Sequence, residues 1–235
     1  MTPSLPHQDQ TLLSTLRARF ADQANFPWER EWPLHAEQSG ASVLIGVMPR
    51  PQGLSVLLTR RTDHLHHHPG QISFPGGRLE DSDASPTEAA LRESEEEIGL
   101  SADQVEILGV LPDYGTSSGF RVTPVVGLVS ADFEPRLDAF EVAELFSVPL
   151  HFVLQTANYQ RHRVQYNGGV RHFFAVPHAG RFIWGATAGM LAMFAAFVSS
   201  THQLHAEGPT ATPQVPPTDV GASAAARPES GVYSG

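Results

Sequence analysis

The chain has 235 residues, a formal net charge of −10 and no cysteine. Its length allows one sizeable domain with its own core, and 41% apolar with 17% charged residues is typical of a globular protein. The acidic balance argues against nucleic acid as a partner, because no basic stripe is present to replace its counterions. The lack of cysteine excludes disulfides, thiolate metal sites and cysteine nucleophiles.

The first part of the chain predicts a helix, a loop and two strands. Residues 9–22 carry leucine and phenylalanine at helical spacing, whereas residues 23–40 are interrupted by proline. The apolar runs 42–48 and 54–60 predict strands joined by a turn. The irregular stretch 62–84 follows, and a loop this long inside a compact domain is usually functional. The chain start resembles no secretory signal, so we expect a cytoplasmic protein.

The next helix has clear signals at both ends. Ser85 to Glu88 form a capping box with Pro86 at the first helical position, and Gly99 provides the stop. The sequence therefore predicts a helix over residues 86–98.

The later segments predict further strands and an apolar helix. Residues 105–111 and 121–130 predict strands, and residues 142–150 predict a short helix leading into a strand. Residues 163–177 predict a hairpin around Asn167-Gly168, and residues 184–199 predict an apolar helix. Strands mixed with a few helices are typical of an α/β layered fold.

One segment needs comparison with a membrane helix. Residues 182–200 are uncharged, long enough to be considered as a span, and contain Gly185 and Gly189 at the spacing of membrane helix pairs. They are rich in alanine and glycine, and Arg181 is the only basic anchor nearby. We therefore expect a buried helix packed on a sheet, and no membrane partner.

The composition also predicts the domain organisation. Residues 206–235 are rich in proline with few large apolar residues, so we expect a disordered tail. Residues 1–39 are expected to form a helix and loop packed on a domain of residues 40–205. The oligomeric state is not predicted by these patterns.

Three carboxylates lie close together near the end of the helix predicted over residues 86–98. Glu93, Glu96 and Glu97 are related by i, i+3 and i+4, so they share one arc of the helix. Like charges at this spacing repel by roughly 0.2–0.5 kcal/mol per pair. Either the helix has a solvated acidic face, or it binds hard divalent cations, which take oxygen ligands. The nearby Gly-Gly pair at 76–77, where backbone can approach a ligand closely, favours the cations.

Residues 77–100 resemble the Nudix box, G-x5-E-x7-R-E-U-x-E-E-x-G-U, where U is a bulky apolar residue. Residues 92–100 match at every charged and glycine position, with Ser94 at an apolar position. Asp83 stands where the box has a glutamate, and the spacer to Arg92 is one residue longer. The family's glutamate there is mainly structural, so these departures concern the loop and not the chemistry.

The resemblance implies an α/β/α sandwich with a mixed central sheet between helices, and hydrolysis of a diphosphate linked to another group. It implies that Glu93, Glu96 and Glu97, with the carbonyl of Gly76, bind Mg²⁺ or Mn²⁺. In the same way it implies that Arg92 holds a glutamate of the box in place.

The resemblance leaves the general base open. Glu96 and Glu97 are the expected catalytic carboxylates of the box. The base is Glu96 itself or a residue of a later loop, where Glu141 and Glu144 are candidates.

The residues that precede the Nudix box narrow the range of possible substrates. Residues 57–77 resemble the extended signature of the coenzyme A pyrophosphatases, L-L-T-x-R-S-x4-R-x2-G-x3-F-P-G-G, with Thr62 for the serine and His67 for the second arginine. With weaker matches downstream, the resemblance covers residues 40–195. It implies coenzyme A or a derivative as the small-molecule substrate, with 3′,5′-ADP and 4′-phosphopantetheine as products.

Four residues are expected to bind the substrate: Arg61, His67, Tyr114 and Arg121. Arg121 lies at a strand start beside a Gly/Ser turn where a phosphate could rest; the alternative is a surface arginine. Tyr114 stacks on adenine or fills the core. The run His64–His68 forms a positively polarised wall near phosphates or an exposed loop.

Two other functions remain open at this point. One is a Nudix hydrolase of another nucleoside diphosphate derivative, such as ADP-ribose or NADH. The other is a Nudix-like module that senses a nucleotide without catalysis, although such proteins typically lose a box carboxylate.

Overall fold

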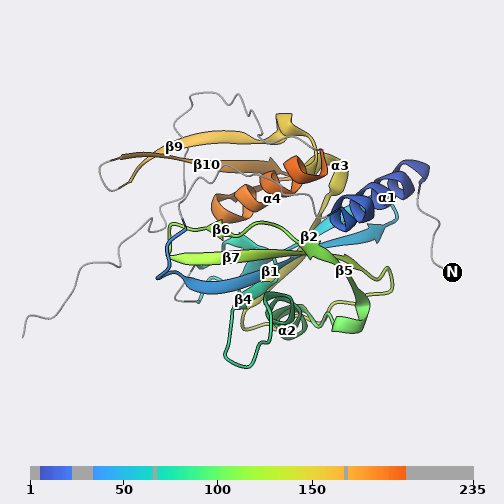
Figure 1. Ribbon diagram of the computed structural model, residues 1–235, viewed down its shortest axis with the longest axis horizontal. Helices are drawn as coiled ribbons and strands as arrows, with labels where there is room; N and C mark the ends of the chain where they lie inside the picture. Colours follow the sequence, from blue (N-terminus) through green and yellow to red (C-terminus); the bar gives the residue numbers. More distant parts are fainter. Residues whose placement is uncertain (1–5, 23–33, 66–67, 167–168, 200–235) are drawn as a thin grey trace, which may run out of the picture.

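The computed structural model describes residues 6–22, 34–65, 68–166 and 169–199. Figure 1 shows two sheets, with one helix, α4, between them and another, α2, on the far face of the larger sheet. The larger sheet contains β1 (Ser39–Arg50), β2 (Gly53–Arg61), β3 (Ile72–Ser73), β4 (Gly76–Arg78), β5 (Val105–Val110), β6 (Tyr114–Gly115), β7 (Phe120–Val129) and β8 (Val142–Pro149).

The larger sheet is mixed. β1 runs antiparallel to β2 and β4 and parallel to β7. β5 and β6 pair with β7, whereas β3 and β8 pair with β2. Ser42 in β1 stands opposite Gly77 in β4 and Thr123 in β7, so the Gly-Gly pair is fixed against the centre of the sheet.

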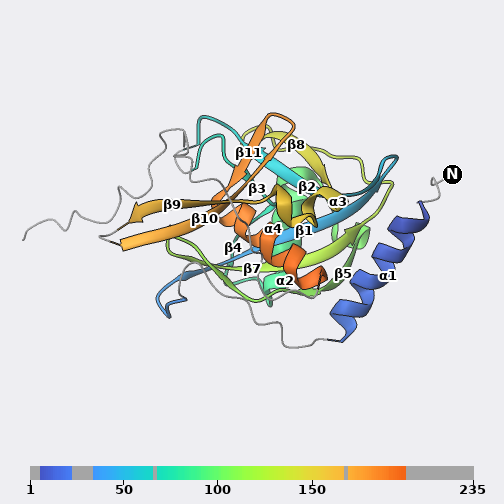
Figure 2. The same ribbon diagram turned by 90° about the horizontal axis from the view of Figure 1, so that it is seen from above.

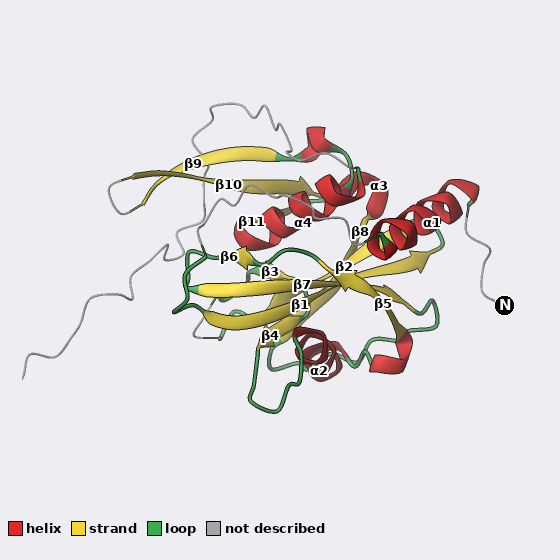
Figure 3. Ribbon diagram, in the orientation of Figure 1, coloured by secondary structure: helices red, strands yellow, loops and turns green. Residues whose placement is uncertain are grey.

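The smaller sheet has the strand order β11-β10-β9. Helix α4 contacts β10 and β11 of this sheet, and Figure 2, which views the molecule from above, shows it beside the ends of β9 and β10. Figure 3 shows the layers of Figure 1 by type of element. The strands of the smaller sheet are β9 (Gln160–Tyr166), β10 (Gly169–His178) and β11 (Arg181–Trp184). The helices are α1 (His7–Ala21), α2 (Pro86–Ile98), α3 (Leu150–Val153), α4 (Gly185–Val198) and the 3-10 helices η1 (Ala102–Gln104) and η2 (Thr156–Asn158).

The core has two parts, one on each face of the larger sheet. Ile45 and Leu58 belong to the part shared with α4, and their neighbours Leu44 and Leu57 belong to the part shared with α2. Successive side chains of a strand point to opposite faces, so a strand covered on both faces reads as a continuous apolar run. This explains the apolar runs that predicted these strands.

The helix α2 has the ends that its sequence predicts. The Ser85 hydroxyl accepts a hydrogen bond from the Glu88 N–H at 3.2 Å, and the Glu88 carboxylate accepts one from the Ala84 N–H at 2.9 Å. Gly99 ends the helix with φ 73°, in the left-handed region that glycine adopts at little cost. The predicted Ser85 cap and glycine stop are confirmed, whereas the reciprocal bond of the capping box comes from Ala84, one residue before the cap.

The expectation for residues 142–150 was wrong in its order. Val142 to Pro149 form a strand from the start, and the short helix α3 follows it. The pairing of β8 with β2, together with burial of Val142 and Val148, overrides the local helical tendency.

The remaining expectations concern the two ends of the chain and the hairpin. The predicted first helix is confirmed as α1, which contacts β5 and α4. β9 and β10 pair as the predicted hairpin requires, but Asn167-Gly168 and the tail 206–235 lie outside the described residues. The apolar helix is α4, and among the described residues no helix is long and apolar enough to cross a membrane.

Candidate active site

Glu97, in the last turn of α2, is the most deeply buried of the three expected carboxylates. Its side chain is 6% exposed, compared with 18% for Glu93 and 60% for Glu96. The Glu97 carboxylate accepts a hydrogen bond from the N–H of Gly76 at 3.2 Å and lies 3.8 Å from the guanidinium of Arg61. Burial raises the pKa of Glu97 to about 8, although the Gly76 bond and the Arg61 charge oppose the rise.

Glu93 lies one turn earlier on the same helix and faces the Gly-Gly pair. A Cβ at position 77 would overlap the Glu93 carboxylate, so this close approach requires glycine. Burial raises the pKa of Glu93, and the neighbouring Arg92 and its hydrogen bond limit the rise. Two partly or fully buried carboxylates thus converge on residues 76 and 77.

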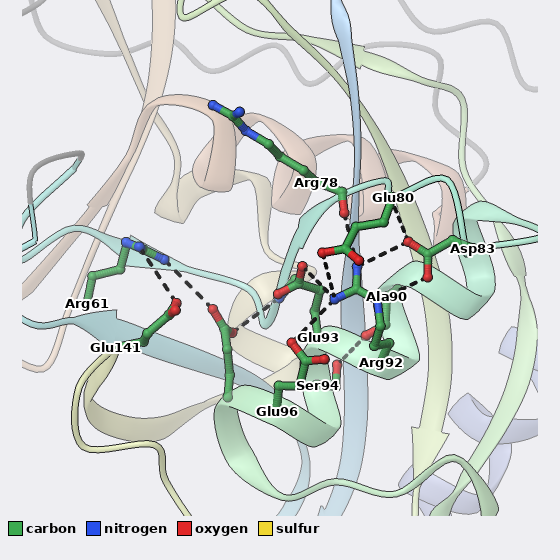
Figure 4. A network of polar contacts seen from close by, with 12 residues as sticks. Arg61, Arg78, Glu80, Asp83, Ala90, Arg92, Glu93, Ser94, Glu96 and Glu141 are labelled. Carbon is green, nitrogen blue, oxygen red and sulfur yellow. Dashed lines mark hydrogen bonds and ion pairs between the residues drawn. The ribbon is translucent and has the colours of Figure 1, made fainter.

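Arg92 ties the loop before α2 to the carboxylates (Figure 4). Its guanidinium donates two hydrogen bonds to Asp83, at 3.0 and 3.1 Å, and single bonds to Glu93 at 3.1 Å and Glu96 at 3.3 Å. It also donates to the carbonyl of Arg78 at 3.1 Å. Asp83, in the position of the box glutamate, therefore anchors the arginine, and Arg92 is a positioning residue. The resemblance implied a mainly structural residue at position 83, but it did not name Arg92 as the partner of Asp83.

A second loop brings Glu141 to the site. Arg61, at the end of β2, lies between Glu97 and Glu141, with 4.0 Å between its guanidinium and the Glu141 carboxylate. The N–H of Thr62 donates to the carbonyl of Glu141 at 3.0 Å, and its hydroxyl donates to the carbonyl of Phe140 at 2.7 Å. These bonds fix the loop, and Figure 4 shows Glu141 beside Arg61.

Glu144 is directed elsewhere. Its carboxylate pairs with Arg181 of β11 and lies 3.7 Å from the guanidinium of Arg60. Arg60 alternates with Arg61 along β2, so these two arginines point to opposite faces of the sheet. Of the two later-loop candidates for the general base, the structure thus brings only Glu141 to the carboxylates of α2.

Two other expected substrate residues, Arg121 and Tyr114, are not gathered around these carboxylates. Arg121 is exposed at the start of β7 and lies 3.7 Å from the Asp113 carboxylate. Tyr114 is 2% exposed on the α4 face of the sheet, where its hydroxyl meets Gly189 and fills the core. His67 lies outside the described residues.

Arg78 is a site residue that the sequence analysis missed. It follows the Gly-Gly pair directly, its carbonyl binds Arg92, and its guanidinium lies 5.1 Å from the centre of the Phe120 ring. Its place next to Gly77 is a signal that could have identified it.

The donor set fits a hard divalent cation. The available groups are carboxylate oxygens and backbone carbonyls, which Mg²⁺ and Mn²⁺ prefer. Glu93 and Glu97, with raised pKa values, ionise more readily beside positive charge, which a bound cation would supply. In the arrangement seen, Arg61 and Arg92 limit these rises in pKa without cancelling them. Among the described residues no three acidic or histidine side chains are spaced to share one ion.

Comparisons with known proteins point to one family. Residues 39–167 match the family model described as the NUDIX domain. "Uncharacterized Nudix hydrolase NudL" from Yersinia enterocolitica is 39% identical over 192 residues, covering 81% of this chain and 95% of that protein. Its namesake from Escherichia coli K12 is 40% identical over 151 residues, covering 64% and 78%. A Nudix hydrolase of known structure from M. smegmatis, RenU, is 23% identical, with a TM-score of 0.42, covering 55% of this chain and 81% of that one.

The fold and the acidic site indicate the class of protein, and the sequence match gives its family. A mixed sheet between helices, with acidic side chains at a glycine-rich loop, is the arrangement of a hydrolase that acts on nucleoside diphosphate derivatives. The NUDIX match spans more than half of the chain, and the chain belongs to the Nudix family. The predicted α/β Nudix fold, with its mixed sheet between helices, is confirmed.

Proposed function

We propose that this protein hydrolyses the diphosphate bond of coenzyme A or one of its derivatives, releasing 3′,5′-ADP and 4′-phosphopantetheine. The observation that carries the proposal is the convergence of two sequence features. The coenzyme A pyrophosphatase signature, residues 57–77, supplies Arg61 and the Gly-Gly pair, and both contact carboxylates of the Nudix box. The substrate signature and the acidic site are therefore parts of one structure.

The box carboxylates would hold the cofactor. Glu93, Glu96 and Glu97, with the carbonyl of Gly76, would bind Mg²⁺ or Mn²⁺. Such ions neutralise charge on the diphosphate oxygens and lower the pKa of a bound water. Arg92 keeps Glu93 and Glu96 in place through its hydrogen bonds to both.

Two residues beyond the box act on the substrate in this proposal. Arg61 offers a guanidinium to a phosphate oxygen, since its contacts to Glu97 and Glu141 are long, at 3.8 and 4.0 Å. Glu141 accepts the proton from the attacking water, because it is the later-loop carboxylate beside the site. Glu96, the most exposed box carboxylate, is the alternative base.

Product analysis tests this proposal. The purified protein is incubated with coenzyme A and Mg²⁺ or Mn²⁺, and 3′,5′-ADP and 4′-phosphopantetheine are separated by chromatography. We expect both products, with loss of turnover in EDTA and recovery on adding metal. Faster cleavage of ADP-ribose or NADH than of coenzyme A would contradict the substrate, and no cleavage of any diphosphate would favour a nucleotide-sensing module. A cytoplasmic location stays a prediction.

A further inference from the structure

The second part of the chain has an unusual charge distribution. Residues 145–206 contain no aspartate or glutamate but four arginines, although the whole chain has a net charge of −10. Three of these arginines lie in β9 and β10. A basic segment in an acidic protein indicates a surface that meets an anion.

Part of this basic segment forms a two-stranded projection. The third strand of the smaller sheet, β11, pairs only with residues 175–178 of β10. Residues 161–166 and 169–174 therefore form a ribbon of two strands, which extends beyond α4 in both Figure 1 and Figure 2. It reaches out at the end of the molecule where β6 lies and β7 begins.

Three basic side chains share one face of this ribbon. Arg161 and Arg163 are two residues apart in β9, and His172 stands directly opposite Arg163 in β10. Arg161 stands opposite Phe174, which belongs to the core shared with α4, so this face looks toward α4 and the larger sheet. The three side chains thus lie on the side of the ribbon that faces α4 and the larger sheet.

The two arginines carry like charges that no residue described by the structure compensates. Arg161 and Arg163 have no ion-pair partner in the part of the chain that the structure describes. Burial lowers the pKa of His172, and the charges of Arg161 and Arg163 lower it further. Arg161 and Arg163 are like charges two residues apart on one face of a strand, so their repulsion costs free energy. A bound anion would offset that cost.

A hydrogen bond and a ring contact connect the ribbon, through residues 184–187, to the segment that precedes the Gly-Gly pair. The Thr187 hydroxyl, in the first turn of α4, donates to the carbonyl of Ile72 at 2.8 Å, four residues before Gly76. At the other end of this connection, the rings of Trp184 and Phe173 pack with centroids 5.9 Å apart, and Phe173 adjoins His172. The ribbon and the glycine loop are therefore held to the same short segment, residues 184–187.

We propose that Arg161, Arg163 and His172 bind a phosphate monoester carried by the nucleotide half of the substrate. Side chains two residues apart on a strand lie about 7 Å apart, so two guanidinium groups can donate to one phosphate. The small size of the cluster and the acidic remainder of the chain disfavour a nucleic acid. This inference rests on the proposed function, because coenzyme A has such a phosphate at the ribose 3′ position in addition to its diphosphate.

Binding measurements test the subsite without requiring turnover. Calorimetry compares 3′,5′-ADP with 5′-AMP, which lacks the second phosphate, on the wild type and on Arg161→Gln/Arg163→Gln. We expect the wild type to bind 3′,5′-ADP at least tenfold more tightly, and the double variant to bind both equally. Arg50→Gln/Arg136→Gln, which removes the same charge elsewhere, should keep the preference.

Kinetics supply a second measurement. The kcat/KM for coenzyme A should fall at least tenfold in the Arg161/Arg163 variant, with no change for 3′-dephospho-coenzyme A. Equal nucleotide affinities in the wild type, a preference that survives in the variant, or displacement of 3′,5′-ADP by equimolar duplex DNA would overturn the inference. Absence of coenzyme A cleavage with the binding preference intact would instead refute the proposed function alone.

Discussion

Replacing Glu97 by glutamine should stabilise the metal-free protein while removing its activity. The folded protein holds this carboxyl at a pKa of about 8, compared with an ordinary value of 4.5. A carboxyl whose pKa is raised by folding binds its proton more tightly in the folded state. Its contribution therefore favours folding at low pH and is lost as pH rises from about 4.5 toward 8.

The size of the effect follows from these two values. Between pH 4.5 and pH 7, each pH unit costs the folded state about 1.4 kcal/mol, which gives about 3 kcal/mol at pH 7. Glutamine keeps an oxygen to accept the Gly76 hydrogen bond and carries no charge. Glu97→Gln should thus raise stability by up to about 3 kcal/mol at pH 7, or roughly 6–12 °C in Tm for a chain of this size.

The assay combines stability with turnover. Thermal unfolding in EDTA at several pH values should show a wild-type Tm that falls relative to the variant between pH 4.5 and 8, with both equal near pH 4.5. With Mg²⁺, the variant should lose about 10³-fold or more in kcat. The exposed neighbour replacement Glu95→Gln is the matched control and should change neither property. A lower Tm for Glu97→Gln at pH 7 would refute the reasoning, because Glu97 would then be a structural partner of Arg61.

Three further variants test separate features. Ser85→Ala removes the cap of α2 and should cost about 1 kcal/mol in urea unfolding, and an unchanged midpoint would contradict the cap. Gly189→Ala pushes a methyl group into the buried Tyr114 ring and should cost roughly 1–3 kcal/mol by the same measurement; a neutral result would show that the ring moves freely. Glu141→Gln should lower kcat by roughly 10²–10⁴ whereas Glu144→Gln stays within about tenfold, and the reverse order would exchange their roles.

The fold could be predicted where local signals and burial agree. The ends of α2 depend on Ser85, Glu88 and Gly99, whose effects are local, so the sequence was sufficient. Residues 142–149 were misread because their strand depends on pairing with β2, which lies far away in the sequence.

The sequence predicted which carboxylates form the candidate site, but not how deeply each one is buried. The spacing of Glu93, Glu96 and Glu97 placed them on one arc, but helical spacing alone does not reveal what covers each side chain. The loop at Gly76 buries Glu97 and leaves Glu96 in solvent. Likewise, no local pattern distinguished Glu141 from Glu144, because the difference lies in which face of the sheet each one reaches.

The position of α4 has a consequence for how the chain matures. Twelve of its 14 residues are buried between two sheets, so this helix has no side suited to water. Residues 185–198 are synthesised well after the Nudix box. Until they leave the ribosome, the apolar inner faces of both sheets stay exposed to solvent. Nascent chains that stall before this point should be substrates for chaperones, and the acidic site should acquire its final shape only when the last helix is inserted.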